Sequence, residues 1–174
     1  MPTGPIRALL ASSPKDKNKV YLAAIPGVDL ARIYDRWGAR LLEQNVRVFL
    51  QARSNVNKGI KRTLENEPEL FFSFNNGITA TAESVTTESG EDGLLIDRLE
   101  NLQIVNGGQT TASVYAAYKA GKSLDRVFVQ MKLSVVSPEE ALELVPRISE
   151  YANSQNKVSS ADFFANPPLS REDR

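Results

Sequence analysis

Cysteine and histidine are both absent from this 174-residue sequence. Without cysteine the chain can form no disulfide and offers no thiol nucleophile, and without either residue it has no Cys/His zinc site. The absence of histidine also removes the commonest general base, and with it a conventional catalytic triad. Any catalysis must therefore use carboxylates, Lys, Arg, Ser, Thr, Tyr or a metal ion held by oxygen ligands.

The sequence also lacks long apolar runs, and the N-terminus lacks the apolar core of a signal peptide. We therefore expect a cytoplasmic protein with no membrane partner. Neither of the phosphate-binding patterns GxxxxGK and GxGxxG occurs, so a P-loop NTPase or a Rossmann dinucleotide domain is not supported. A content of 41% hydrophobic and 24% charged residues suits one globular domain with a real core.

The formal net charge is zero, so neither sign of charge is in excess, but the charged residues are unevenly distributed along the sequence. Residues 32–62 carry eight basic and two acidic side chains, whereas residues 63–100 carry nine acidic side chains and one basic. One interpretation is a basic face that attracts phosphates. The other is the ordinary solvated surface of a helix.

The spacing of apolar residues predicts an α/β or α+β fold with a mixed sheet of about five strands flanked by helices. Helical spacing covers residues 28–37, 41–50, 55–66, 110–121 and 138–152, with Trp37 expected in the core and Pro146 expected to kink or split the last helix. That last helix is expected to bury Ala141, Leu144, Val145, Ile148, Tyr151 and Ala152. Strand patterns cover residues 6–11, 19–25, 69–85 in two halves, 94–105 and 126–136.

A strand, a tight turn and a helix are predicted in succession over residues 102–121, LQIVNGGQTTASVYAAYKAG. The turn consists of Asn106, Gly107, Gly108, Gln109, Thr110 and Thr111. Two glycines allow the free N–H groups at a helix start to approach an anion closely, with threonine hydroxyls beside them, which outlines a phosphate site. The alternative is that the glycines only make a sharp turn and a threonine caps the helix.

Two further turns are rich in amide side chains. The first is Asn75-Asn76-Gly77, and the second contains Asn153, Gln155, Asn156 and Lys157. Amides both donate and accept hydrogen bonds, so they suit base edges, ribose hydroxyls and the waters around a metal. All three turns stand at the ends of predicted elements, where an α/β protein gathers a ligand site. Read alone, Asn75-Asn76-Gly77 is typical of a hairpin or a bulge.

Several of these motifs, in order, resemble the AIPR family, bacterial proteins named for abortive infection phage resistance. The resemblance covers most of the chain from about residue 19 and is carried by YDRWGARLLEQNVRVFL (34–50), NKGI (57–60), FNNGIT (74–79), QIVNGGQTT (103–111) and ANSQNKVSSADFFAN (152–166). It implies a single AIPR-like domain over residues 19–166. Residues 1–18 then form an N-terminal segment, either a short strand or an arbitrary boundary, and residues 167–174 a truncated tail. Because the family's proteins are usually longer, the rest of a longer parent chain is an expected partner.

More distantly, the order of the parts is similar to DGQHR-type and ParB/sulfiredoxin-like domains, which implies a core of that kind. In that superfamily the first motif lies against nucleotide phosphates or, in other members, serves DNA-modification functions. Residues 106–109 match the first motif and residues 153–157 the later one. Thr110 or Thr111 stands where an Arg is expected, so a shared NTPase activity is not implied unless Lys157 or Arg47 supplies the cation.

Three functional hypotheses follow. The first is a phage-defence domain that binds a nucleotide, with Mg²⁺ where the nucleotide brings it, or a nucleic-acid phosphate. In it Gln109 and Thr110 contact the anion, the other amide-rich turns shape the pocket, and Arg47 and Lys58 add attraction. The second is a metal-dependent phosphoesterase or nuclease with Asp162 as the candidate catalytic carboxylate. The third is a protein-interaction module in which the amides lock the loops.

Binding is favoured over catalysis, because the chain lacks His, Cys and the expected Arg. A nuclease site built from Asp97, Gln130 and Lys132 would have only one carboxylate for its metal, and no metal ligands are assigned. The sequence gives no expectation for the oligomeric state.

Overall fold

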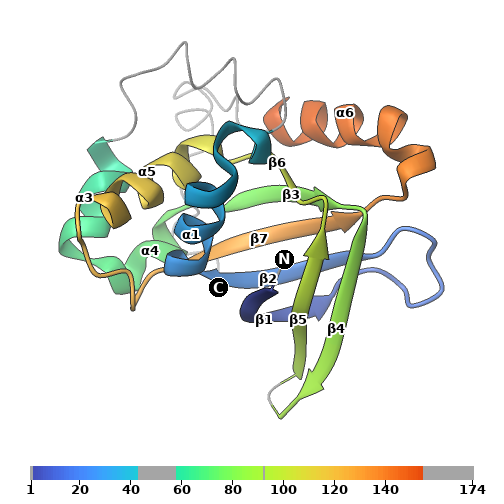
Figure 1. Ribbon diagram of the computed structural model, residues 1–174, viewed down its shortest axis with the longest axis horizontal. Coiled ribbons are helices and arrows are strands. Elements are labelled where there is room, and N and C mark those ends of the chain that lie inside the picture. Colours follow the sequence, from blue (N-terminus) through green and yellow to red (C-terminus); the bar gives the residue numbers. More distant parts are fainter. Residues whose placement is uncertain (1, 43–57, 92, 155–174) are drawn as a thin grey trace, which may run out of the picture.

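The computed structural model describes residues 2–42, 58–91 and 93–154, and these contain a seven-stranded mixed sheet (Figure 1). The strands are β1 (Pro2–Leu10), β2 (Val20–Pro26), β3 (Ile78–Ala82), β4 (Ser84–Gly90), β5 (Gly93–Glu100), β6 (Gln103–Asn106) and β7 (Phe128–Val135). Their order across the sheet is β4-β5-β1-β2-β7-β3-β6. Strands β3 and β7 pair in parallel, and the other neighbours pair antiparallel. The expectation of a mixed sheet flanked by helices is confirmed.

The expected number of about five strands is wrong, because two of the predicted strands each divide. Residues 78–90 break at Glu83 into β3 and β4, and residues 93–106 break at Asn101 into β5 and β6. The two breaks face each other: Ser84 pairs with Glu100 on one side of them and Thr81 pairs with Gln103 on the other. We call the paired segments 78–90 and 93–106 the divided hairpin.

The divided hairpin supplies both edges of the sheet. Its β4–β5 half joins the sheet through β1, and its β3–β6 half joins through β7. Figure 1 shows the β4–β5 half projecting away from β3 and β6. Strands β1, β2 and β7 lie between the two halves in the sheet, so the sheet curls to let β4–β5 and β3–β6 meet at the break in the hairpin.

The helices gather in two places (Figure 1). Helices α1 (Gly27–Trp37), α3 (Lys58–Asn66), α4 (Phe71–Phe74) and α5 (Gly108–Lys119) lie at one end of the sheet, with short 3₁₀ turns η1 (Gly38–Leu41) and η2 (Pro68–Leu70). Helix α6 (Pro138–Ser154) lies beside the edge strand β6. The core unites α1 and α5 with the sheet, and its fully buried side chains include Leu30, Phe71, Ile25, Ile104, Val114, Met131 and Leu133.

The strand expected over residues 69–74 is wrong, because this stretch is helical. Pro68 begins η2, where its fixed φ and missing N–H suit the first position of a helical turn. The N–H and the side-chain Nδ2 of Asn75 then both donate to the carbonyl of Phe71, at 3.1 and 3.0 Å, and end α4. Asn75-Asn76-Gly77 therefore joins a helix to a strand, and the hairpin interpretation is wrong as well.

Trp37 does not lie in the core as expected, because 37% of it is exposed. Helix α1 buries the stripe that includes Leu30 and Ile33, whereas Trp37 is its last residue. Gly38 follows with φ +53°, a left-handed conformation that turns the chain away at that point. The tryptophan is therefore left at the end of the helix, where it lines a cleft described below.

Helix α6 is less buried than its apolar pattern predicts. Tyr151 is 62% exposed, and the fully buried position is the polar Ser149. The other expected core positions, Ala141, Leu144, Val145, Ile148 and Ala152, are half-buried. The reason is its place at the sheet edge, where β6 is its main neighbour. The helix also continues through Pro146, so the expected split does not occur.

Candidate functional site

Two glycine turns touch at one end of the sheet. Strand β3 begins after Asn75-Asn76-Gly77, β6 ends at Asn106-Gly107-Gly108, and the strands pair through Thr79 and Asn106. A Cβ on Gly107 would lie 2.6 Å from the carbonyl oxygen of Gly77, and a Cβ on Gly77 would overlap the carbonyl group of Gln130. Both glycines also have positive φ, +89° and +72°. Only glycine satisfies both requirements, so these residues fix how closely the two turns approach.

Helix α5 begins in this contact and has no side-chain cap. Its N-cap is Gly107, in the left-handed region, and no side chain bonds to its first N–H groups as a cap. Thr111 is fully buried, and its hydroxyl donates to the carbonyl of Gly107 at 3.2 Å. Thr110 is 7% exposed and Gln109 is half-buried. The expected threonine cap is therefore absent, because the Thr111 hydroxyl bonds back along the helix.

Asn153, the one described residue of the third amide-rich stretch, lies in the last turn of α6 and not in a turn between elements, and it reaches the same place. Asn106 Nδ2 donates to the carbonyl of Ala152 at 2.6 Å, and Asn153 Nδ2 donates to the carbonyls of Val105, at 3.1 Å, and Ser149, at 2.7 Å. The Ser149 hydroxyl also donates to the Val105 carbonyl, at 3.3 Å. These bonds fasten the end of α6 to the end of β6. The structure thus brings the two glycine turns and Asn153 of α6 together.

The amides themselves are engaged with the backbone. Asn75, Asn106 and Asn153 each donate to main-chain carbonyls, so their Nδ2 groups hold the turns in place. Asn76 is exposed at the turn next to them. The remaining predicted site residues, Arg47, Gln155, Asn156, Lys157 and Asp162, lie outside the described residues. Their roles stay predictions.

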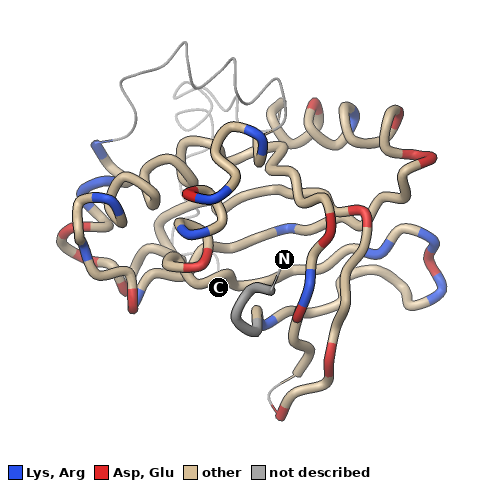
Figure 2. The backbone as a smooth tube through the Cα atoms, in the orientation of Figure 1, with Lys and Arg blue, Asp and Glu red and all other residues tan. Residues whose placement is uncertain are grey.

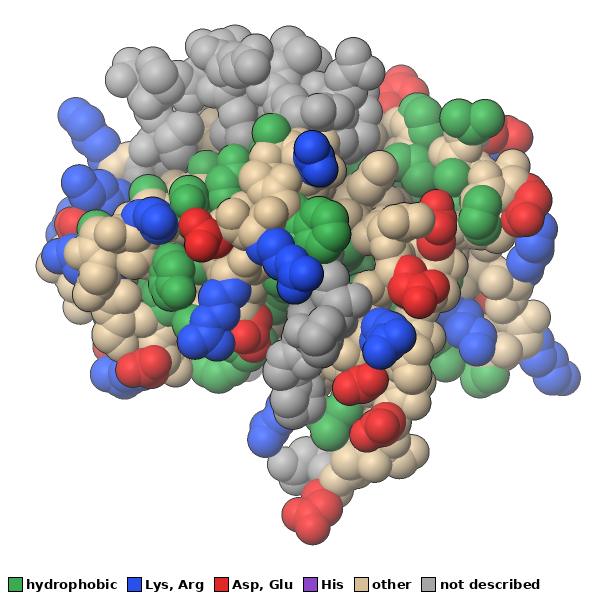
Figure 3. Space-filling view, viewed as in Figure 1, with side chains coloured by type: hydrophobic (Ala, Val, Ile, Leu, Met, Phe, Trp, Pro, Cys, Tyr) green, Lys and Arg blue, Asp and Glu red, His purple; other side chains and the backbone are tan. Residues whose placement is uncertain are grey.

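Charges of both signs surround the helical end. Lysines and arginines lie on α1 and α3, near α5 (Figure 2). On the face shown in Figure 3, basic and acidic side chains interleave, which matches a solvated surface better than a phosphate-binding face. The Tyr115 hydroxyl of α5 donates to Asp35 of α1 at 2.8 Å. This hydrogen bond, with slight desolvation and the charge of Asp35, raises the pKa of Tyr115.

The weak nuclease alternative does not assemble. Asp97 lies on β5, whereas Gln130 and Lys132 lie on β7, and strands β1 and β2 separate them. At about 4.8 Å between neighbouring strands, three steps across the sheet put roughly 14 Å between these positions. Among the described residues no group of three or more acidic side chains could hold a metal ion.

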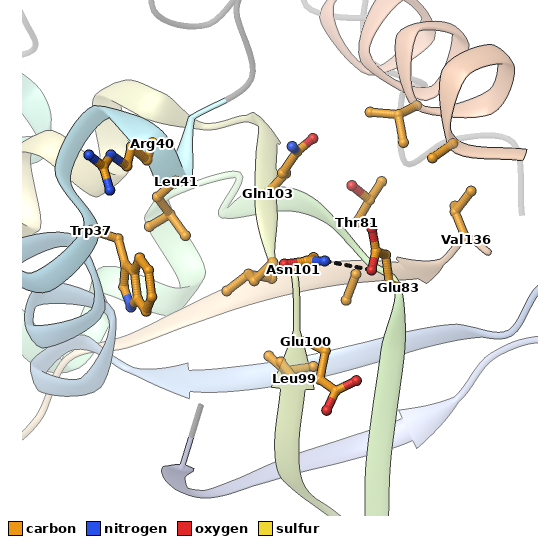
Figure 4. A pocket seen from close by; sticks show the side chains of 14 residues that line it. Trp37, Arg40, Leu41, Thr81, Glu83, Leu99, Glu100, Asn101, Gln103 and Val136 are labelled. Atoms are coloured by element: carbon orange, nitrogen blue, oxygen red, sulfur yellow. Dashed lines mark hydrogen bonds between the residues drawn. The ribbon is translucent and has the colours of Figure 1, made fainter. Parts of the chain in front are cut away.

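A cleft lies at the other end of β6, and no pattern in the sequence predicted it. It has a volume of about 710 Å³ and lies where the divided hairpin separates (Figure 4). Its lining combines Trp37 and Arg40 with Glu83, Asn101 and Gln103. No local motif marks these residues, because they come from segments far apart in the sequence. The only available signal was the lone Trp at a helix end.

The fold and the two touching glycine turns define an α/β domain with a mixed sheet. Comparison with known families identifies the family to which this domain belongs. The family model described as AIPR protein matches residues 42–172. The chain therefore belongs to the AIPR family, whose name denotes abortive infection phage resistance. No curated protein and no solved structure matches. A ParB/sulfiredoxin-like core is not confirmed, and none of the helices in the described ranges has the length and apolar character needed to span a bilayer.

Proposed function

We propose that this AIPR domain serves phage defence by binding a phosphate group of a nucleotide or nucleic acid at the start of α5. The observation that carries the proposal is the contact between Gly77 and Gly107 beside a helix N-terminus without a side-chain cap. Nucleotides and nucleic acids of an infecting phage are cytoplasmic, so the proposed site of action is the cytoplasm.

The physical basis is the helix start itself. The first N–H groups of a helix lack partners within the helix, and the aligned peptide dipoles place partial positive charge there. Gly107 and Gly108 add no side chain that would hold a phosphate away. In this arrangement Gln109 and the exposed Asn76 contact the anion from two sides, and Thr110 contributes its main chain, because its side chain is buried.

The bonded amides have a positioning role in this proposal. Asn106 and Asn153 anchor the strand end to α6, and Asn75 ends the short helix before β3. The turns are therefore held before a ligand arrives, and preorganisation lowers the entropic cost of binding. The same hydrogen bonds support a second candidate, a protein-interaction module with no small ligand, in which the amides only lock the loops.

The test is calorimetric titration of the full chain with inorganic phosphate, nucleoside triphosphates and short oligonucleotides, with and without Mg²⁺. Gln109→Glu places a carboxylate at the helix start, where it suits the helix dipole but repels a phosphate. We expect this variant to keep its melting temperature and to lose at least tenfold in affinity. Lys119→Gln is the control, because it lowers the net charge equally at the other end of α5.

The outcomes separate the two candidates. Equal loss of affinity in Gln109→Glu and Lys119→Gln would mean that only net charge matters and would contradict the site. Absence of binding to every phosphate tested, together with a large stability loss in Asn106→Ala, would support the interaction module.

A further inference from the structure

The cleft at the divided hairpin arises from the way the two strands separate. Glu83 and Asn101 lie at the break, where the N–H of Glu83 still donates to the carbonyl of Glu100 at 2.9 Å. Asn101 has φ +50° and is the only non-glycine residue with positive φ among those described. Beyond the break, β4–β5 and β3–β6 diverge to opposite edges of the sheet. The diverging strands leave a space that none of the described strands fills.

Helical elements wall this space on two sides. Trp37, Arg40 and Leu41 come from the end of α1 and from η1. On the other side lie Val136, which directly follows β7, and Ala141 and Val145 of α6. In Figure 4, Trp37 stands on one side, Val136 on the other, and Asn101 and Glu83 lie between them. A volume of about 710 Å³ falls within the roughly 300–1,000 Å³ of small-molecule sites, which also combine apolar walls with a few polar groups.

Trp37 offers the cleft an aromatic surface. It is partly exposed, and the guanidinium of Arg36 lies 5.5 Å from its ring centroid. Arg40, also in the lining, adds a second positive charge close by. A planar neutral ring can stack on this indole, whereas a cationic ligand would meet the repulsion of two guanidinium groups.

The lining of the cleft includes two carboxylates that accept hydrogen bonds. Glu83 accepts a hydrogen bond from Asn101 Nδ2 at 2.5 Å, and Glu100 accepts one from the Ser84 hydroxyl at 2.7 Å. An ionised carboxylate has about four acceptor positions, so each retains capacity for a ligand. Among the lining residues Arg40 is the one cation and Glu83 and Glu100 are two carboxylates, with Arg36 outside the lining, and this balance disfavours a phosphate beside the carboxylates. They favour a ligand that presents N–H donors.

We propose that this cleft binds a nucleoside whose base stacks on Trp37 and presents adjacent N–H donors to Glu83. Guanosine has this arrangement, with N1–H beside its amino group, whereas adenosine has an acceptor at the corresponding ring nitrogen. Gln103 and Asn101 supply further amide contacts to the base or ribose. The cleft is separate from the α5 turn, because Gln103 and Asn106 stand at opposite ends of β6.

The single tryptophan provides a direct readout. Guanosine, adenosine and spermidine are titrated into the full chain while Trp37 fluorescence is followed, and calorimetry measures the affinity. We expect guanosine to quench the fluorescence and to bind at least tenfold more tightly than adenosine. Glu83→Gln, which keeps an oxygen for Asn101, is expected to lower guanosine affinity at least tenfold. Glu88→Gln, on the exposed part of β4, is the matched control and is expected to bind as the unaltered chain does.

Three results would overturn the proposal. They are equal affinity for guanosine and adenosine, tighter binding of spermidine than of guanosine, and absence of quenching by millimolar guanosine. A nucleoside carries no phosphate, so Gln109→Glu should leave guanosine binding unchanged. Failure of the phosphate site and failure of this cleft are therefore distinguishable.

Discussion

The two ends of strand β6 differ in how closely the surrounding chain packs against them. At Asn106 the chain enters a turn in which backbone meets backbone, glycines leave no spare volume, and amides bond to main-chain carbonyls. At Gln103 the strand borders a cleft of about 710 Å³ with an exposed indole and two carboxylates. The motif-rich end is built by close packing and offers a ligand mainly its backbone N–H groups. The end without a motif has room for a whole ring.

The largest effect is expected at Gly77, where any side chain breaks the close-packed end. Gly77→Ala places a Cβ against the carbonyl of Gln130 at a φ of +72°. A left-handed conformation costs an alanine about 1–2 kcal/mol and overpacking typically another 1–3 kcal/mol, so we expect a loss of roughly 3 kcal/mol in the free energy of unfolding. Urea denaturation measures it.

Gly121→Ala is the matched control for Gly77→Ala. Gly121 has the same φ of +72°, but a Cβ there meets no atom within 4 Å. Only the conformational cost of about 1–2 kcal/mol applies. Equal losses in the two variants would show that the close approach at Gly77 contributes nothing.

The next largest effect is expected at Asn106. Asn106→Ala removes the donor to the Ala152 carbonyl and leaves that acceptor partly buried, at a cost of about 1–2 kcal/mol. Asn76→Ala, at the exposed amide of the neighbouring turn, should change stability by less than about 0.5 kcal/mol. Thermal and urea unfolding compare the two, and similar losses would contradict the anchoring role of Asn106.

A substitution at the open end should change binding more than stability. Asn101→Gly removes the conformational cost of a non-glycine residue at φ +50°, but it also removes the hydrogen bond from Asn101 to Glu83. These contributions oppose each other, so we expect a net stability change within about 0.5 kcal/mol. Guanosine affinity should nevertheless fall, since Glu83 loses its orienting partner. A large loss of stability with unchanged guanosine binding would contradict the expectation that Asn101 matters more for binding than for stability.

The smallest effect concerns Glu140, near the start of α6. Its hydrogen bond with Lys17, at 2.9 Å, is the main cause that lowers the pKa of Glu140. Because the folded pKa is depressed, the stabilisation is present above the unfolded pKa and is lost as pH falls through the folded value. Lys17→Ala should therefore raise the pKa of Glu140, measured by NMR titration. Lys15→Ala, in the same loop, should leave it unchanged.

Local features of this fold were predictable and the non-local ones were not. Alternation from Val127 to Leu133 predicted the buried face of β7, and Gly38 and Gly121 marked the ends of α1 and α5, because these signals lie within one element. The division at Glu83 and Asn101 was missed, since it depends on strands from elsewhere pairing with each half.

The candidate site was likewise predictable in its local features and not in its non-local ones. Gly-Gly between a strand and a helix predicted the turn at residues 106–108, and the approach of the two glycine turns followed from their places at element ends, whereas Asn153 was expected in a turn and lies in α6. The sequence could not show that Asn75, Asn106 and Asn153 donate to main-chain carbonyls. An asparagine can bind either a ligand or the main chain, and its surroundings in the fold decide which. The exposure of Trp37 could not be predicted either, because the residues that line the cleft with it come from distant parts of the sequence.

The N-terminal hairpin of β1 and β2 lies outside the segment 42–172 that the AIPR family model matches, yet it pairs with β5 on one side and β7 on the other. Without residues 2–26, both of those inner strands would become new edges with unpaired N–H and C=O groups. Such edges are templates for pairing between molecules, so a chain that began at residue 42 would be prone to aggregate. The sheet of this domain therefore includes two strands that precede the segment matched by the family model.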